Sequence, residues 1–215
     1  MTTPLLIDGP DNATTTFILA HGAGAGMEHE FMQAMAAAIA SAGIRVIRFE
    51  FPYMQKRRLD GLKYPPDRAP KAIAAFEAVI EQVQQQFPDT QHWFIGGKSM
   101  GGKLASMIAA DSAERFSLAG VICLGFPFTP PNKPENFRGQ HLESIATPVL
   151  IIQGQRDTFG GEEAIKGFPL SKNVSVQILP DGDHSFKPRV KSGFTLQQNM
   201  DAAVEEVVRF FEGLG

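Results

Sequence analysis

Short, mostly apolar runs recur along this chain, and stretches with helical spacing separate them. The runs are typical of buried strands and lie at residues 17–20, 44–51, 92–95, 118–126, 148–152 and 174–179. A shorter run at 5–7 is expected to form an edge strand. Because most of the predicted strands are apolar throughout, we expect helices to cover both faces of the sheet.

Between these runs, apolar residues recur three or four positions apart, as one face of a helix requires. The helical stretches centre on residues 31–39, 73–83, 103–110 and 204–211. Strands that alternate with helices predict an α/β fold with a mostly parallel sheet. The segment 53–70, which contains Pro65-Pro66, is expected to be a loop. No composition break divides the chain, so we expect one domain over residues 1–215.

Composition restricts the classes of function. A net charge of −3 gives no electrostatic reason to expect a nucleic acid or an anionic membrane as partner. The single cysteine, Cys123, excludes an internal disulfide, and its apolar neighbours favour a buried side chain over a nucleophile. No signal peptide is recognisable, and no apolar run approaches the ~20 residues of a membrane span. We therefore expect a cytoplasmic protein.

The pentapeptide GKSMG at residues 97–101 stands between a predicted strand and a predicted helix. In this strand–turn–helix context, a G-x-S-x-G sequence presents its serine hydroxyl at the tip of a strained turn. Glycines are expected on either side because a Cβ would clash where strand and helix pack closely. The motif makes Ser99 a candidate nucleophile.

A serine hydroxyl needs an adjacent base, and a histidine base needs a carboxylate to orient it. Ser99, Asp157 and His184 each follow a predicted strand, where ligands bind in parallel sheets, and their order is that of α/β-hydrolases. We predict that Ser99 is the nucleophile, His184 the base and Asp157 the orienting acid. Asp157 has a second interpretation as a turn cap. Asp181 and Asp183 are rival carboxylates, which we interpret as part of a solvated turn.

An oxyanion needs backbone donors close to the serine. We predict that the Met100 N–H is one donor and that the glycine-rich loop 21–26 supplies the other, from Ala23 first or Gly24 second. His21 is expected to be structural, its ring bonded to nearby backbone. The loop lacks the G-x-G-x-x-G spacing of a dinucleotide site, and the histidines lack metal-ligand spacing. We therefore expect no metal and no organic cofactor.

Four motifs, HGAGAG, GKSMGG, QGQRD-x-FG and GDHSFK, together resemble those of small α/β-hydrolases related to dienelactone hydrolase. They are most similar to bacterial members of the group that includes an animal testis-expressed hydrolase-like protein and a histone-acetyltransferase-complex subunit. The resemblance covers residues 15–213 and implies an α/β-hydrolase fold without a large cap domain. It also implies the same roles for Ser99, Asp157 and His184.

The expected function is that of a serine hydrolase that cleaves a small ester or thioester through an acyl-enzyme intermediate. Peptidase and lyase chemistries use the same groups and stay open. The alternative is a non-catalytic protein-interaction module that keeps the hydrolase fold, against which the complete Ser/Asp/His set argues. The sequence gives no prediction of oligomeric state.

The pocket is expected to be edged by residues 53–70, residues 126–134 and Met27, with aromatic walls. The candidate wall residues, each of which could equally belong to the core, are Phe126, Phe128, Phe159 and Phe186.

Lys98 has two interpretations, one along the surface with its ammonium in water and one near the pocket mouth. Five further basic residues lie in loops on the same predicted edge and could favour an anionic substrate or form a solvated rim. These residues are Lys56, Arg57, Arg58, Lys187 and Arg189.

Overall fold

The strands form one sheet in the order β1-β3-β2-β4-β5-β6-β7, in a computed structural model that describes residues 2–214. Only β1 is antiparallel to its neighbour, and every other adjacent pair is parallel. The strands are β1 (Leu5–Asp8), β2 (Thr15–Ala20), β3 (Arg45–Phe49), β4 (His92–Lys98), β5 (Leu118–Leu124), β6 (Val149–Gly154) and β7 (Val174–Leu179). The predicted α/β class and the edge strand near the N-terminus are confirmed.

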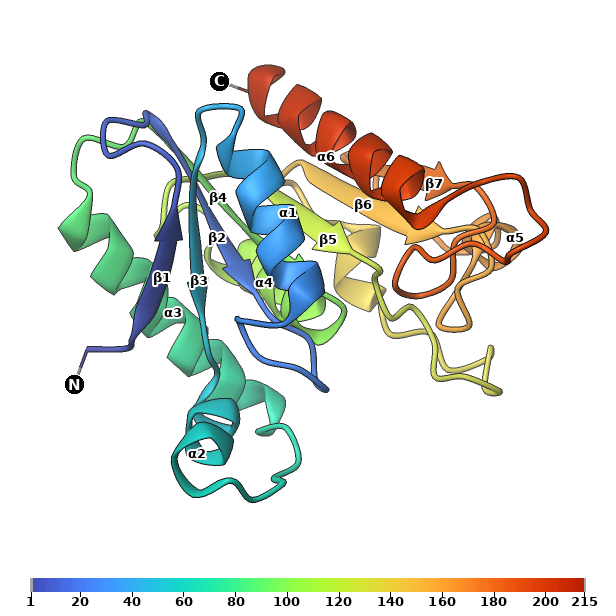
Figure 1. The fold of residues 1–215 in the computed structure, drawn as a ribbon, viewed down its shortest axis with the longest axis horizontal. Helices are drawn as coiled ribbons and strands as arrows, with labels where there is room; N and C mark the ends of the chain where they lie inside the picture. The colour runs from blue at the N-terminus through green and yellow to red at the C-terminus, as the bar shows by residue number, and fades with distance from the viewer. Residues whose placement is uncertain (1, 215) are drawn as a thin grey trace.

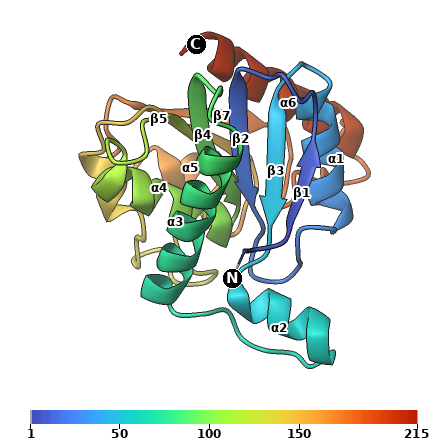
Figure 2. The ribbon, with the colours of Figure 1, turned by 90° about the vertical axis from the view of Figure 1, so that its left-hand side faces the viewer.

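Helices α1 and α6 cover one face of the sheet, and α3 and α4 cover the other (Figures 1 and 2). The helices are α1 (Glu30–Ala40), α2 (Pro52–Asp60), α3 (Ala69–Gln86), α4 (Met100–Ser112), α5 (Glu162–Ile165) and α6 (Leu196–Glu212), and a 3-10 turn spans Gln140–Glu143. Within residues 2–214, none of them combines the length and the apolar character needed to cross a bilayer.

Alternation of side chains along β4 explains why apolar residues stand next to one another in the central strands. Phe94 and Ile95 are neighbours, and both are fully buried. Phe94 packs in the core that α1 and α6 cover, beside Phe211, whereas Ile95 packs in the opposite core with Leu104 of α4. Successive residues of a strand point to opposite faces, so a sheet covered on both sides needs apolar residues at both.

The expectation of a loop over residues 53–70 is wrong in its first half, where α2 forms. Pro52 is its first helical residue, a position at which no N–H is needed and the proline φ suits the helix. Gly61 ends it in the left-handed conformation, at φ 71°. Tyr53 and Met54 are buried, whereas the rest of the helix is more exposed, and α2 lies off the end of the sheet in Figure 1.

Candidate active site

Ser99 stands at the junction between β4 and α4 with a backbone that non-glycine residues seldom adopt. Its φ is 50° and its ψ −111°. A Cβ added to Gly97 would lie 2.4 Å from the carbonyl oxygen of Ala20, and one added to Gly101 would lie 2.6 Å from the same oxygen. Neither glycine could carry a side chain without a shift of the backbone, as the sequence motif predicts.

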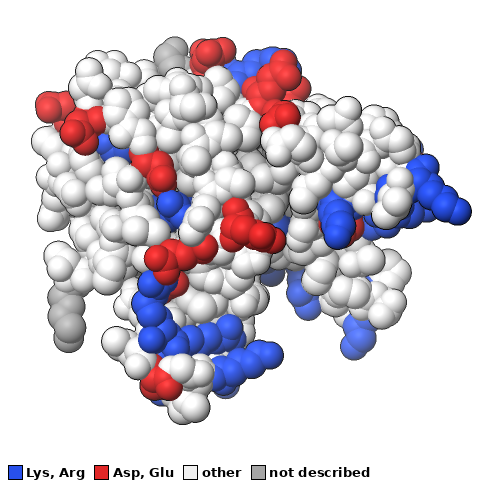
Figure 3. All heavy atoms as spheres, viewed as in Figure 1, with Lys and Arg blue, Asp and Glu red and all other residues white. Residues whose placement is uncertain are grey.

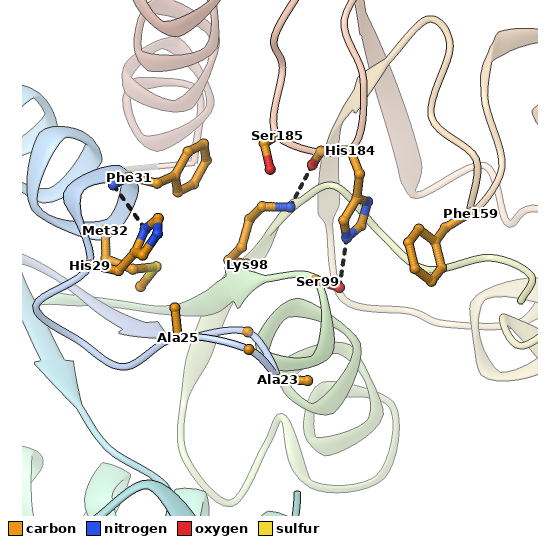
Figure 4. Close-up of a pocket in the computed structure, with 12 residues that line it drawn as sticks. Ala23, Ala25, His29, Phe31, Met32, Lys98, Ser99, Phe159, His184 and Ser185 are labelled. Carbon is orange, nitrogen blue, oxygen red and sulfur yellow. Dashed lines mark hydrogen bonds between the residues drawn. The ribbon is translucent and has the colours of Figure 1, made fainter. Parts of the chain in front are cut away.

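The imidazole of His184 lies between the Ser99 hydroxyl and the Asp157 carboxylate (Figure 4 shows the first of these contacts). Its Nε2 is 2.9 Å from Ser99 Oγ, and its Nδ1 is 2.7 Å from Asp157 Oδ2. Asp157 cannot donate as a carboxylate, so Nδ1–H donates to it and Nε2 accepts from the serine hydroxyl. A histidine bonded in this way can take up the serine proton while the carboxylate stabilises the resulting imidazolium.

The Asp157 carboxylate is fixed by two further donors. The side-chain amide of Gln153 donates to Oδ2 at 2.9 Å, and the backbone N–H of Phe159 donates to Oδ1 at 2.8 Å. Asp157 therefore caps the following turn and also contacts the histidine, so both interpretations from the sequence describe it. Gln153 received no role of its own from the sequence, although it begins the QGQRD motif at the end of the apolar run of β6.

The two rival carboxylates are engaged elsewhere. Asp183 accepts hydrogen bonds from the backbone N–H groups of Ser185 and Lys187. Asp181 is buried, not solvated as expected, and is paired with the guanidinium of Arg189, which lowers the pKa of Asp181 to about 2. Both acids support the loop after β7, and Asp157 is the acid that contacts the ring.

The glycine-rich loop after β2 is tied to the β3–α2 connection. The His21 Nδ1–H donates to the Gly22 carbonyl at 2.7 Å, and its Nε2 accepts from the Phe51 N–H at 3.1 Å. Burial lowers the pKa of His21, which suits the neutral ring that this pattern requires. The Tyr53 hydroxyl lies 3.2 Å from the Gly22 carbonyl and 3.1 Å from that of Ala23. The structural role predicted for His21 is confirmed.

This loop passes directly against the serine. A Cβ added to Gly22 would lie 3.7 Å from the Cβ of Ser99. Ala23 and Gly24, the candidate oxyanion donors, line the same cavity as Ser99. Met100 is the first residue of α4, so its N–H has no acceptor within the helix. The oxyanion roles of these three residues stay predictions.

A cavity of about 350 Å³ opens beside Ser99 (Figure 4). Its walls come from loop 22–25, from the beginning of α1 and from Phe159. Phe31 and Met32 supply apolar surface from α1. His29 is the N-cap of that helix and accepts a hydrogen bond from the Phe31 N–H at 3.2 Å.

Most of the pocket walls predicted from sequence lie elsewhere. Phe159 lines the cavity, 4.4 Å from the His184 ring centre to centre. Phe126, Phe128 and Phe186 are fully buried core residues, the second of the two outcomes foreseen for them. Met27 is also buried, and neither it nor the segment 53–70 lines the cavity.

Lys98 fits neither of its two sequence interpretations completely. Its side chain is largely enclosed, and its Nζ donates to the main-chain oxygen of His184 at 2.6 Å (Figure 4). A Cβ added to Gly125 would lie 2.9 Å from that Nζ, so the glycine leaves the space that the ammonium occupies. Burial lowers the pKa of Lys98 to about 8. Lys98 is one of the residues that line the cavity beside Ser99.

The other basic residues do not surround this cavity. Lysine and arginine side chains gather over the α2 end of the molecule in Figure 3. There Arg58 is paired with Glu28 at 2.6 Å and with Glu50 at 2.8 Å, and Lys56 packs over the Tyr64 ring. None of these side chains lines the cavity beside Ser99, and neither do Lys187 and Arg189.

A second serine–histidine pair, Ser106 and His141, is structural. Ser106 is fully buried and donates to the Lys103 carbonyl, and its Oγ lies 2.8 Å from His141 Nε2. Cys123 is fully buried as well, with a pKa that burial raises, as its apolar neighbours predict. Over residues 2–214, no three His, Cys, Asp or Glu side chains are grouped as metal ligands.

Comparison with known proteins places this geometry in a family context. A family model described as an alpha/beta hydrolase domain matches residues 13–212. Dienelactone hydrolase from Anabaena variabilis is 18% identical, with 98% of this chain and 91% of that chain covered and a TM-score of 0.72. An α/β serine hydrolase without a lid from Xanthomonas campestris is 20% identical, with coverages of 96% and 88% and a TM-score of 0.69.

Est1E from Butyrivibrio proteoclasticus, in a structure with bound ferulic acid, is 16% identical, with coverages of 97% and 95% and a TM-score of 0.73. At these identities, the solved structures show a shared fold. They do not bear on the narrower testis-expressed group, so that part of the resemblance stays a prediction. The family model spans nearly the whole sequence, and the chain therefore belongs to the alpha/beta hydrolase family.

Proposed function

We propose that this protein is a serine hydrolase that cleaves small carboxylic esters or thioesters through an acyl-enzyme intermediate. The observation that carries the proposal is the hydrogen-bonded series from Ser99 Oγ through the His184 ring to the Asp157 carboxylate. It ends in a cavity of about 350 Å³, which suits a small acyl group. The similarity in fold to proteins described as esterases and serine hydrolases supports the same reaction class.

The proposed reaction begins when Ser99 Oγ attacks the substrate carbonyl carbon and its proton passes to His184 Nε2. The Met100 N–H, with the N–H of Ala23 or Gly24, would stabilise the oxyanion, and one such donor is typically worth about 3–4 kcal/mol. The carbonyl–oxygen or carbonyl–sulfur bond then breaks, and the leaving group takes the proton from His184. Water, deprotonated by His184, finally attacks the acyl-enzyme, which releases the carboxylic acid and restores the Ser99 hydroxyl.

A fluorophosphonate probe tests the nucleophile directly. We expect it to label the wild type and not Ser99→Ala. Ser185→Ala is the matched control, because Ser185 is another serine that lines the same cavity and it should leave labelling unchanged. Hydrolysis of p-nitrophenyl acetate and of a matching thioester, followed in the same variants, would show which bond is cleaved faster.

The non-catalytic alternative makes the opposite prediction. A folded wild-type protein that neither reacts with the probe nor hydrolyses any ester would favour an interaction module. Labelling that disappears in Ser185→Ala and persists in Ser99→Ala would show that Ser99 is not the nucleophile.

A further inference from the structure

The Lys98 ammonium has bonding capacity that its protein contacts do not use. An ammonium carries three N–H donors, and in the described part of the chain Nζ donates to one acceptor, the His184 carbonyl. No carboxylate of residues 2–214 lies within ion-pairing distance of it. The ring centres of Phe31 and Phe186 lie 5.6 and 5.9 Å from this Nζ.

The other residues that line the cavity leave the charge of Lys98 without a competing charge. Of the side chains that line the cavity, Lys98 is the only lysine or arginine, and none is a carboxylate. Phe31, Met32 and Phe159 make much of the wall apolar. In surroundings that are poor in water, a charge acts on a ligand more strongly than it would at an exposed surface.

We propose that the preferred substrates are esters whose acyl group carries a carboxylate, and that the Lys98 ammonium binds that carboxylate. This inference rests on the proposed function. The acyl group stays attached to Ser99 in the intermediate, and Ser99 and Lys98 face the same cavity (Figure 4). A carboxylate matches the single positive charge, whereas a phosphate near its second ionisation would leave excess charge buried in an apolar site.

A pair of substrates with equal shape isolates the charge. The p-nitrophenyl monoester of glutaric acid and p-nitrophenyl 5-methylhexanoate differ in that a carboxylate replaces an isopropyl group of similar size. We expect the wild type to have the higher kcat/KM for the glutarate ester, after subtraction of uncatalysed hydrolysis. Hydrogen bonds to charged groups predict a preference of about 10- to 100-fold.

Lys98→Gln and Lys98→Arg separate charge from positioning. The glutamine is neutral, so it should lose most of the preference: kcat/KM for the glutarate ester should fall much more than kcat/KM for the 5-methylhexanoate ester. The arginine should keep the preference in part, because it remains charged. Lys187→Gln is the matched control: this lysine is exposed in the same loop as His184, outside the cavity, and its loss should leave the ratio unchanged.

Equal losses for both esters in Lys98→Gln would overturn the inference and leave Lys98 as a residue that only positions His184. Equal kcat/KM values for the two esters in the wild type would also overturn the inference, and they would leave the proposed function unaffected. A binding measurement keeps the two hypotheses apart. In the Ser99→Ala background, calorimetry with monomethyl glutarate should show binding that weakens by about 10-fold or more when Lys98→Gln is added. Unchanged binding would contradict the inference even if no ester is turned over.

Discussion

The side-chain amide of Gln153 donates a hydrogen bond of 2.9 Å to the Asp157 carboxylate. The acceptor is the same Oδ2 that lies 2.7 Å from the His184 ring. The carbonyl oxygen of the same amide accepts from the Phe126 N–H at 2.7 Å, and the side chain is fully buried. Gln153 thus links the backbone at the end of β5 to the acid, and it fixes the direction in which the acid faces the histidine.

Gln153→Glu should strongly reduce activity. The substitution keeps the shape but places a carboxylate against Asp157, and two buried carboxylates in contact cannot both ionise near neutral pH. A protonated or displaced Asp157 would no longer orient His184, so we expect kcat to fall by at least about 10-fold. Steady-state kinetics and urea unfolding should be measured together. Gln177→Glu on β7, away from the serine, is the control, and an equal loss in it would remove the special role of Gln153.

Asp157→Asn should lower kcat by up to about 10⁴-fold with little change in fold. An amide can present its N–H to the ring and so stabilise the wrong tautomer, in which Nε2 can no longer accept the serine proton. Asp183→Asn tests the rival acid and should cost far less, because Asp183 contacts backbone N–H groups. Comparable losses of kcat in the two variants would speak against Asp157 as the orienting acid.

The sheet and the serine, acid and histidine positions could be predicted because local patterns specify them. Strands buried on both faces are mostly apolar, and a parallel sheet brings the residues after β4, β6 and β7 to one edge. Gly97 and Gly101 are required because a Cβ at either position would collide with the main chain of Ala20. Any sequence that forms this turn meets the same restriction.

The helix α2, the cavity walls and Gln153 depend on tertiary contacts. The polar composition of α2 conceals its helical character, and its main signals were Pro52 at the start and Gly61 at the end. An aromatic residue in a loop that follows a strand can face the cavity, as Phe159 does, or the core, as Phe128 does. Its sequence neighbours do not distinguish these outcomes. The partner of a buried amide is likewise decided by packing.

Tyr53→Phe should slow the chemistry more than it weakens binding. The hydroxyl contacts the carbonyl groups of Gly22 and Ala23, and the loss of one such bond typically costs about 0.5–1.5 kcal/mol. A looser loop would present its N–H groups less well to the oxyanion, so kcat should fall several-fold while KM changes little. Tyr64→Phe, whose hydroxyl contacts the exposed Asp60, is the control. A rise in KM with unchanged kcat would indicate that Tyr53 serves substrate binding instead.

Gly101→Ala should destabilise the protein by at least about 1–3 kcal/mol, because a Cβ there meets the main-chain oxygens of Ala20 and His21 at 2.6 and 2.7 Å. The strand and the helix would have to separate at the serine, so labelling of Ser99 should decrease as well. Urea unfolding measures the first effect. Gly167→Ala, where the nearest atom is 3.6 Å away, should be nearly neutral. Equal stability of the two variants would show that the turn is more adaptable than its contacts indicate.

The preference for the glutarate ester should depend on pH, because burial lowers the pKa of Lys98 from its ordinary 10.5 to about 8. The charged ammonium is present below this pKa and is lost above it, so the ratio of kcat/KM for the two esters should be full at pH about 6.5 and should decline towards pH about 9.5. Dividing one ester by the other cancels the pH dependence of every step that both reactions share.

The neighbouring charges of Asp157 and Asp183 raise the pKa of Lys98 against this burial, and His29 lies across the cavity. Asp183→Asn should therefore move the midpoint of the ratio to lower pH, and His29→Gln should leave it in place. Lys98→Arg should give a ratio that stays flat over the whole range, because a guanidinium does not deprotonate there. A wild-type ratio that is large but independent of pH would mean that a different group binds the substrate carboxylate.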